Sequence, residues 1–401
     1  MFSHSRFSGA LRHWRASMLG LLLMCFPLFA VSAQVPPGVA MDAEAATAEQ
    51  AVASTQVLDM TSLVGLEDLI ERIADQDAVF IGETHDSYAD HLNQLAIIER
   101  LHARGKPLAI GMEFFQQPFQ SVLDAYVAGD ISEQDMLKQT EYFDRWRFDY
   151  RLYRPILHFA REHGIALIAL NVPKELTEKV GGQGLDALSA EERARLPTQL
   201  DASDPAYRER IKAVFDLHPQ GPDSDFERFL AVQLLWDEGM AEQAARYLEM
   251  HPGTTLVVLA GSGHIEYGQG IPQRLKRRRP VEMVTILNGT HYAFAPERAD
   301  YLLFPQPAEL PERGLLGVML DIESDGEGIG IQGFAAESGA RDAGLKEGDR
   351  LVRIGERTIE DYADVRIAMI DATPGERLVV EALRPGLIGE PERLMVTVEL
   401  H

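Results

Sequence analysis

Carboxylate and imidazole side chains follow three separate apolar runs of this chain. Glu83 and His85 come directly after one run, Glu113 after a second and His264 after a third. Glu and His bind divalent metals, and they also act as general acids and bases. Any one of them alone would be an ordinary core or capping residue. The signal is that they recur at corresponding positions.

The elements that must position these residues are short apolar runs separated by helical patterns. The runs cover residues 78–81, 108–112, 165–170, 255–259 and 281–287. Runs of this length, rich in Val, Ile and Leu, predict buried parallel strands in an α/β layer fold with helices on both faces. Ligands bind at the carboxyl ends of the strands in such sheets, so we expect the side chains to meet in one cavity.

Two kinds of chemistry are open for this cavity. Glu83 and Glu113 are candidate catalytic residues, either of them as a general base. Glu83, His85 and His264 are candidate ligands of a divalent metal such as Mn, Co or Zn. The single cysteine, Cys25, lies in the apolar leader, so no thiolate ligand is expected in the mature chain.

Haem is the other candidate ligand of the same region. The candidate haem-contacting residues are His85, His91, His264 and Tyr267. Imidazole and tyrosine phenolate are both axial ligands of haem iron, and Tyr267 lies three residues after His264. His91 begins a stripe of residues at helical spacing, so we expect it to point inward, near His85.

Residues 145–154 (RWRFDYRLYR) combine cations with aromatic rings in a chain that is otherwise strongly acidic. Lys and Arg number 38 against 62 Asp and Glu, for a net charge of −24. This balance argues against general binding of nucleic acid or of an anionic membrane. The cluster is the best place for recognition of a carboxylate, a haem propionate included, and a solvated surface is the open alternative.

The N-terminal region reads as an export signal. Arg residues precede the apolar run 18–33, which is shorter than the roughly 20 residues that span a bilayer. The small residues before Gln34 predict cleavage after Ala33 and a location in the periplasm or elsewhere in the bacterial envelope. The residue before Cys25 is not small, which disfavours lipidation. Residues 34–60 are expected to be a flexible linker.

With these residues in view, residues 61–305 resemble the ChaN family of haem-binding proteins, in the superfamily that also holds Tiki metalloproteases and erythromycin esterases. The matching segments are 81–85 (IGETH), 111–113 (GME), 153–157 (YRPIL), 170–173 (LNVP) and 260–264 (AGSGH). The resemblance implies haem or iron handling in the bacterial envelope, an association with the outer envelope, and a homodimer. It also implies that Glu83, His85, Glu113 and His264 line the pocket.

After a proline-rich linker, 306–312, the sequence pattern changes. Short apolar runs are separated by glycine turns, and one helical pattern occurs at 361–371. Residues 313–401 resemble a PDZ domain of the bacterial periplasmic-protease type, on the segments 314–318 (GLLGV), 343–351 (AGLKEGDRL) and 374–376 (PGE). The resemblance implies that Leu315, Leu316, Gly317 and Val318 bind the carboxylate of a peptide C-terminus, while the peptide adds as a strand.

The sequence therefore favours an envelope protein that binds haem or a metal and recruits a partner through its PDZ domain. The alternative is a metal-dependent hydrolase, a protease or esterase, with Glu83 or Glu113 as general base. A pure interaction protein is disfavoured because the pocket residues are present. Whether the chain is an enzyme stays open at this point.

Overall fold

The computed structural model of the protein describes residues 58, 61–219, 221, 224–322, 326–386 and 390–401. The predicted leader 1–33, and nearly all of the predicted linker 34–60, lie outside these ranges. Within them, every helix is too short or too polar to cross a lipid bilayer.

The N-terminal domain is built on one parallel sheet of six strands. Its strands are β1 (Ala78–Glu83), β2 (Leu108–Gln116), β3 (Ala166–Asn171), β4 (Thr255–Gly261), β5 (Met283–Asn288) and β6 (Tyr301–Leu303). Their order across the sheet is β3-β2-β4-β1-β5-β6, and every neighbouring pair is parallel. The five strands predicted from the apolar runs are confirmed. The sixth, β6, lies outside the predicted runs and is a half-buried edge strand of three residues within the short apolar segment 301–304 (YLLF).

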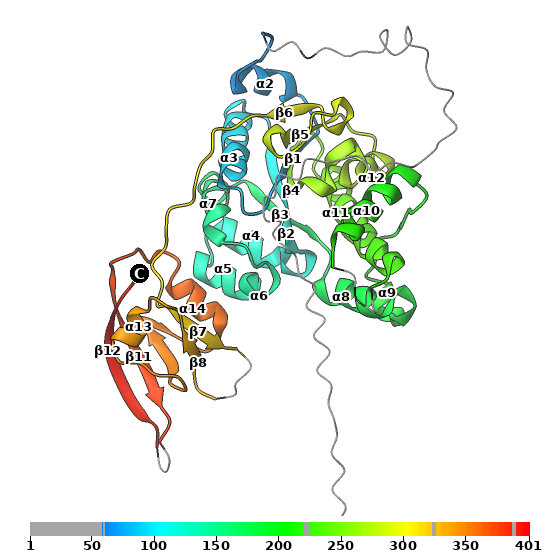
Figure 1. Cartoon of the computed structure of the whole chain (residues 1–401). Helices are drawn as coiled ribbons and strands as arrows, with labels where there is room; N and C mark the ends of the chain where they lie inside the picture. The colour runs from blue at the N-terminus through cyan, green and yellow to red at the C-terminus, as the bar shows by residue number, and fades with distance from the viewer. Residues whose placement is uncertain (1–57, 59–60, 220, 222–223, 323–325, 387–389) are drawn as a thin grey trace, which may run out of the picture.

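Helices cover both faces of this sheet. The α-helices are α2 (Leu66–Ile73), α3 (Tyr88–Ala103), α4 (Gln120–Ala128), α5 (Glu133–Gln139), α6 (Tyr142–Arg145), α7 (Arg154–His163), α8 (Lys174–Gln183), α9 (Ala190–Arg193), α10 (Pro205–Leu217), α11 (Phe226–Met250) and α12 (Ile271–Arg278). The 3-10 turns are η1 (Gln117–Phe119), η2 (Tyr150–Leu152), η3 (Leu185–Ala187), η4 (Ser262–His264), η5 (Glu266–Gly268), η6 (Gly289–His291) and η7 (Pro296–Arg298). Helices α3, α4 and α7 lie on one side of the sheet and α11 and α12 on the other (Figure 1).

Alternation along the strands produces two cores. Val79 and Ile81 face the layer of α2, α3 and α7, whereas Phe80 between them faces α11 and α12. Because successive side chains of a strand point to opposite faces, a strand covered on both faces must be apolar throughout, as the predicted runs are.

The order of the strands fixes where a ligand site can form. After β1 the chain forms β2 and β3, which lie toward one edge of the sheet. After β4 it forms β5 and β6, which lie toward the other edge, so β1 and β4 are neighbours at the point where the strand order reverses. Glu83, at the carboxyl end of β1, is level with Gly261, at the end of β4. This crevice is where open α/β sheets bind ligands.

The C-terminal domain is a small antiparallel sheet with short helices. Its elements are β7 (Val318–Asp321), β8 (Ile329–Phe334), α13 (Gly339–Asp342), β9 (Arg350–Ile354), β10 (Arg357–Thr358), α14 (Tyr362–Ala368), β11 (Arg377–Arg384) and β12 (Glu392–Glu399). The strand order is β12-β11-β9-β8-β7, which leaves β7 at an edge, and β10 pairs with β9. Helix α14 lies within the single helical pattern predicted at 361–371.

The two domains meet through α14. Ala363 and Ile367 belong to the same apolar cluster as the α3 and α7 layer, and α14 lies against α5 and α6 (Figure 1). At the rim of this contact, Lys138 Nζ donates to Asp361 Oδ2 at 2.6 Å and to Asp364 Oδ2 at 2.9 Å. Arg154 forms an ion pair with Asp371 across the same boundary.

Candidate functional site

Glu83 is the centre of a buried polar network at the end of β1. Its Oε1 lies 2.8 Å from His85 Nδ1 and accepts a hydrogen bond from the Tyr153 hydroxyl at 3.0 Å. Its Oε2 accepts from Gln94 Nε2 at 2.9 Å and lies 3.2 Å from His91 Nδ1. Burial alone would raise the pKa of Glu83, but the imidazoles of His91 and His85 hold that pKa well below its usual range.

His91 points inward beside His85, as the helical stripe predicts. Its side chain is 1% exposed, and its Nε2 lies 3.1 Å from the backbone oxygen of His85. Its ring packs against that of Tyr153, with 4.4 Å between centroids. Burial disfavours the charged imidazole, yet the pKa of His91 is raised because the Glu83 carboxylate faces it.

His264, just after β4, is held between two carboxylates. Its Nδ1 lies 2.6 Å from Asp237 Oδ1, and its Nε2 lies 3.4 Å from Glu113 Oε1. Asp237 also accepts from the Tyr207 hydroxyl at 2.7 Å, and Glu113 from the Gly261 N–H at 2.6 Å. Despite burial, the charges of Glu113 and Asp237 raise the pKa of His264 to about 10. This imidazole is therefore protonated at neutral pH.

His85 joins the two halves of the network across Gly261. A methyl group built on Gly261 would lie 2.9 Å from His85 Cε1, 3.2 Å from His85 Nε2 and 3.5 Å from Glu113 Oε2. The pKa of His85 is raised because, against burial, both Glu83 and Glu113 favour the charged ring. Glu83, His85, Glu113 and His264 thus meet at one edge of the sheet, as their positions after the strands predict.

We expect Gly261→Ala to disturb this edge, because the added methyl overlaps the His85 ring. Overpacking of this kind costs about 1–3 kcal/mol of unfolding free energy. Gly263→Ala is the matched control, because a methyl there meets nothing within 4 Å. Urea unfolding of the two variants measures the difference, and equal stabilities would contradict the close approach.

Among the described residues, no group of three or more His, Asp or Glu side chains has an arrangement that could hold a metal ion. This applies to the set Glu83, His85 and His264 that the sequence suggested as metal ligands. The geometry explains it, because their imidazole nitrogens already face carboxylates. A protonated imidazole has no lone pair to offer a metal.

Tyr267, the remaining haem candidate, lies outside the network on the same segment as His264. Its backbone is left-handed, with φ 59° and ψ 8°, which is uncommon for a residue with a side chain. The half-buried ring faces the guanidinium of Arg298, 5.0 Å from its centroid. The phenol oxygen forms no hydrogen bond with any residue that the structure describes. Strained backbone of this kind concentrates at functional sites.

Two arginines near Tyr267 have buried donors that find no partner in the described chain. Arg298 bonds Glu266 Oε2 at 2.5 Å and Arg210 bonds Glu266 Oε1 at 3.1 Å. Arg298 Nε and Arg210 Nη2 nevertheless remain without a hydrogen bond. Phe294, in the loop just before Arg298, is 56% exposed. An apolar ring system that carries carboxylates fits this combination, because its carboxylates would satisfy the spare donors.

Most arginines of the cluster 145–154 form ion pairs with carboxylates of the same chain. Arg145 pairs with Glu141 and Glu175, and Arg151 pairs with Asp149. Arg154 pairs with Glu133 and Asp371. Its aromatic members lie against the network instead, with Trp146 and Phe148 at 4.7 and 4.8 Å from the His85 ring.

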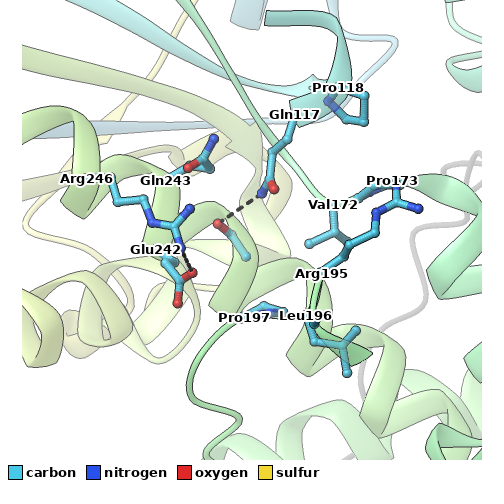
Figure 2. Close-up of a pocket in the computed structure, with 12 residues that line it drawn as sticks. Gln117, Pro118, Val172, Pro173, Arg195, Leu196, Pro197, Glu242, Gln243 and Arg246 are labelled. Carbon is cyan, nitrogen blue, oxygen red and sulfur yellow. Dashed lines mark hydrogen bonds and ion pairs between the residues drawn. The ribbon is translucent and has the colours of Figure 1, made fainter. Parts of the chain in front are cut away.

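A separate hollow of about 330 Å³ lies beside α11, at the carboxyl ends of β2 and β3. Figure 2 shows Gln117, Val172 and Arg195 around it, with Arg246 paired to Glu242 at 2.6 Å. None of the network residues lines this hollow.

A family model described as "Haem-binding uptake, Tiki superfamily, ChaN" matches residues 69–275, just over half of the 401 residues. The chain belongs to this ChaN family. A PDZ domain model matches residues 307–381. Both resemblances noted in the sequence are thereby confirmed.

Individual relatives are distant. A solved structure described as cofacial heme binding to ChaN of Campylobacter jejuni is 18% identical, with a TM-score of 0.48, and covers 61% of this chain and 92% of that one. The HtrA3 PDZ domain bound to a phage-derived ligand is 20% identical, with a TM-score of 0.19, and covers 22% of this chain and 86% of that one. Protein RETICULATA-RELATED 5, chloroplastic, of Arabidopsis thaliana is 26% identical over 232 residues, 52% of this chain, which spans only 30% of that protein.

Proposed function

We propose that this ChaN-family protein binds haem on the face around Tyr267 and handles haem or iron in the bacterial envelope, while its PDZ domain recognises protein C-termini. The observation that carries the haem proposal is the unpaired phenol of Tyr267, beside two arginines with spare buried donors. We also propose that the protein lies in the envelope, associates with the outer envelope and forms a homodimer. The predicted leader and the family resemblance support this part of the proposal.

The histidines are poorer axial ligands than Tyr267. Both ring nitrogens of His264 face carboxylates, and those of His91 face Glu83, Gln94 and a backbone oxygen. His85 Nδ1 faces Glu83, and its Nε2 lies so close to Gly261 that a methyl group built there would be 3.2 Å away. The pKa values of all three rings are raised by the facing carboxylates, which favours the protonated form, and a protonated ring offers iron no lone pair.

When bound, haem would supply the iron and its redox and ligand chemistry. The chain's own residues would hold it, with the Tyr267 phenol binding the iron and Arg210 and Arg298 binding the propionates. The buried network has a positioning role in this proposal. It fixes His264 between Glu113 and Asp237, and thereby the segment that carries Tyr267.

Titration of the chain with haemin tests this proposal. We expect a saturable Soret band at micromolar protein, with one haem bound per chain. A haemin spectrum that stays the same with and without the protein would contradict the proposal.

The loop 315–318 has the features of a carboxylate-binding loop. The N–H groups of Leu316 and Gly317 donate to no other described residue, whereas the Leu315 N–H is used by the His401 oxygen. The Leu316 oxygen is held by the Ala340 N–H at 3.0 Å and by the Ser338 hydroxyl at 3.3 Å. These contacts support the loop while leaving its donors available, and the edge strand β7 follows it directly.

Peptides with a free C-terminus are therefore expected to bind at least about tenfold more tightly than the same peptides amidated, because a charged acceptor is lost on amidation. Fluorescence anisotropy with labelled peptides measures the ratio. Equal affinities would contradict carboxylate recognition by this loop.

A further inference from the structure

The groove beside the loop 315–318 is shared between the two domains. A hollow of about 250 Å³ lies along the carboxylate loop, β7 and α14, and one of its walls belongs to the N-terminal domain. Apolar side chains form much of the lining on the PDZ side, including Leu316, Leu320, Val365 and Met369. Phe143, Asp149 and Arg151 line it from the ChaN-type domain.

Three guanidinium groups but only one carboxylate line this groove. Arg151 comes from the ChaN-type domain, Arg313 from the start of the PDZ domain, and Arg366 from α14. The one acidic residue in the lining is Asp149, which leaves a surplus of positive charge in a chain whose net charge is −24. The local sign is therefore opposite to that of the whole molecule, so an anionic ligand would be drawn to this position.

The pairing inside the groove is incomplete. Arg151 forks Asp149, with Nη2 to Oδ2 at 2.9 Å, while Arg313 reaches the same carboxylate only at 3.7 Å. Arg366 has no carboxylate partner in the described chain; it donates to the Tyr362 hydroxyl at 2.9 Å and faces the Phe143 ring at 5.0 Å. Burial and the charge of Arg366 lower the pKa of Arg313, as expected where cations outnumber anions.

We propose that this composite groove selects a protein C-terminus that ends in an apolar residue and carries Asp or Glu within the three residues before it. The proposal rests on the PDZ function proposed above. The apolar lining takes the last side chain, and the N–H groups of Leu316 and Gly317 take the terminal carboxylate. The acidic side chain binds the arginines whose charge is not fully neutralised, because a guanidinium donates two parallel hydrogen bonds to a carboxylate.

The occupant is a partner rather than the segment at His401. His401 exchanges two backbone hydrogen bonds with Leu315, so this residue is already paired beside the loop. Because Arg151 and Asp149 belong to the ChaN-type domain, both domains take part in choosing the partner.

The experiment uses residues 34–401 and a set of fluorescent peptides with an apolar last residue. One Glu is placed in turn at each of the three preceding positions, and each peptide is made with Gln instead of Glu and as the C-terminal amide. At the best position we expect Glu to bind about tenfold more tightly than Gln at low salt, as for one charge-assisted pair, with a smaller ratio at high salt.

The two proposals fail in different ways. If free acids bind better than amides but Glu and Gln peptides bind equally, the acidic preference is wrong and the carboxylate loop stands. If free acids and amides bind equally, the proposed PDZ function itself is wrong. Tighter binding of the Gln peptides would also overturn the acidic preference.

Variants identify the arginines. Arg366→Gln and Arg151→Gln are each expected to reduce the Glu-to-Gln ratio severalfold while the acid-to-amide ratio is kept. Arg353→Gln is the control, because Arg353 is an exposed arginine of the same domain that does not line the groove. Thermal unfolding of each variant confirms folding. An unchanged Glu-to-Gln ratio in both groove variants would overturn the proposal.

Discussion

Replacement of Tyr267 by Phe is expected to weaken haemin binding by at least about a hundredfold. The substitution removes only the phenol oxygen, and Tyr267 is the one candidate haem ligand, among those predicted from the sequence, whose side chain makes no hydrogen bond in the described chain. Loss of an outer-shell partner alone costs about 10- to 100-fold in metal affinity, so loss of the ligand itself should cost no less. The Soret titration used for the parent chain measures the effect.

Tyr247→Phe is the matched control for this variant. Tyr247 is a half-buried tyrosine on α11 whose ring stacks on His251, away from Arg298. It should leave the haemin affinity unchanged. An undiminished Soret band in Tyr267→Phe, or equal losses in both variants, would remove Tyr267 from the haem site.

The second large effect is on stability. Glu83→Gln is expected to lower the free energy of unfolding by about 3–5 kcal/mol, the usual cost of removing one partner of a buried ion pair. Glu83 is 2% exposed and lies within 3.2 Å of two imidazoles, and the change leaves both without their anion. Urea unfolding near pH 6 measures the loss.

Glu71→Gln is the control for the stability effect. Glu71 is 69% exposed and reaches Arg104 only at 3.5 Å, so this pair should contribute less than about 1 kcal/mol. If Glu83→Gln were as stable as Glu71→Gln, the network would not contribute to the fold as described.

The same network gives the stability a defined pH dependence. Glu83 has a lowered pKa, so its contribution is fully present above its unfolded value of 4.5 and is lost as the pH falls toward the folded value. His85 and His91, the imidazoles that face Glu83, have raised pKa values, so the contribution of their pairing with Glu83 is fully present below 6.5 and is lost as the pH rises through the folded values. We therefore expect the difference between the parent chain and Glu83→Gln to be largest between about pH 4.5 and 6.5. A difference that grows steadily up to pH 9 would contradict this.

The part of the site that could be predicted is the part fixed by strand ends. Glu83, Glu113 and His264 each follow a buried apolar run, and the ends of parallel strands share one edge of a sheet. His91 could be placed because a helical stripe has a definite face. These arguments need only local sequence and the topology common to α/β folds.

The partners on long helices could not be predicted in this way. Asp237 orients His264 from the middle of α11, where an apolar stripe of Val232 and Leu235 favours plain core packing. Tyr207, on α10, is brought to Asp237 only by the packing of α10 against α11. A buried acid on an apolar helix face is a signal, but its partner depends on tertiary contacts.

The ion pairs of the cationic segment could not be predicted from the sequence either. The arginines of residues 145–154 look like a free cationic patch, yet Arg145 and Arg154 meet carboxylates from distant elements, Glu175 and Glu133. The contact of α14 with the first domain could not be predicted either, because it depends on how the two domains dock and not on the sequence of one domain alone. The composite groove follows from that docking.

The most direct test of the account is a crystal structure of the haemin complex of residues 34–401. We predict iron within bonding distance of the Tyr267 phenol oxygen, with the propionates on Arg210 and Arg298 and the Glu83 network unchanged. Iron bound to His85 or His264, or no porphyrin on the Tyr267 face at saturating haemin, would contradict it.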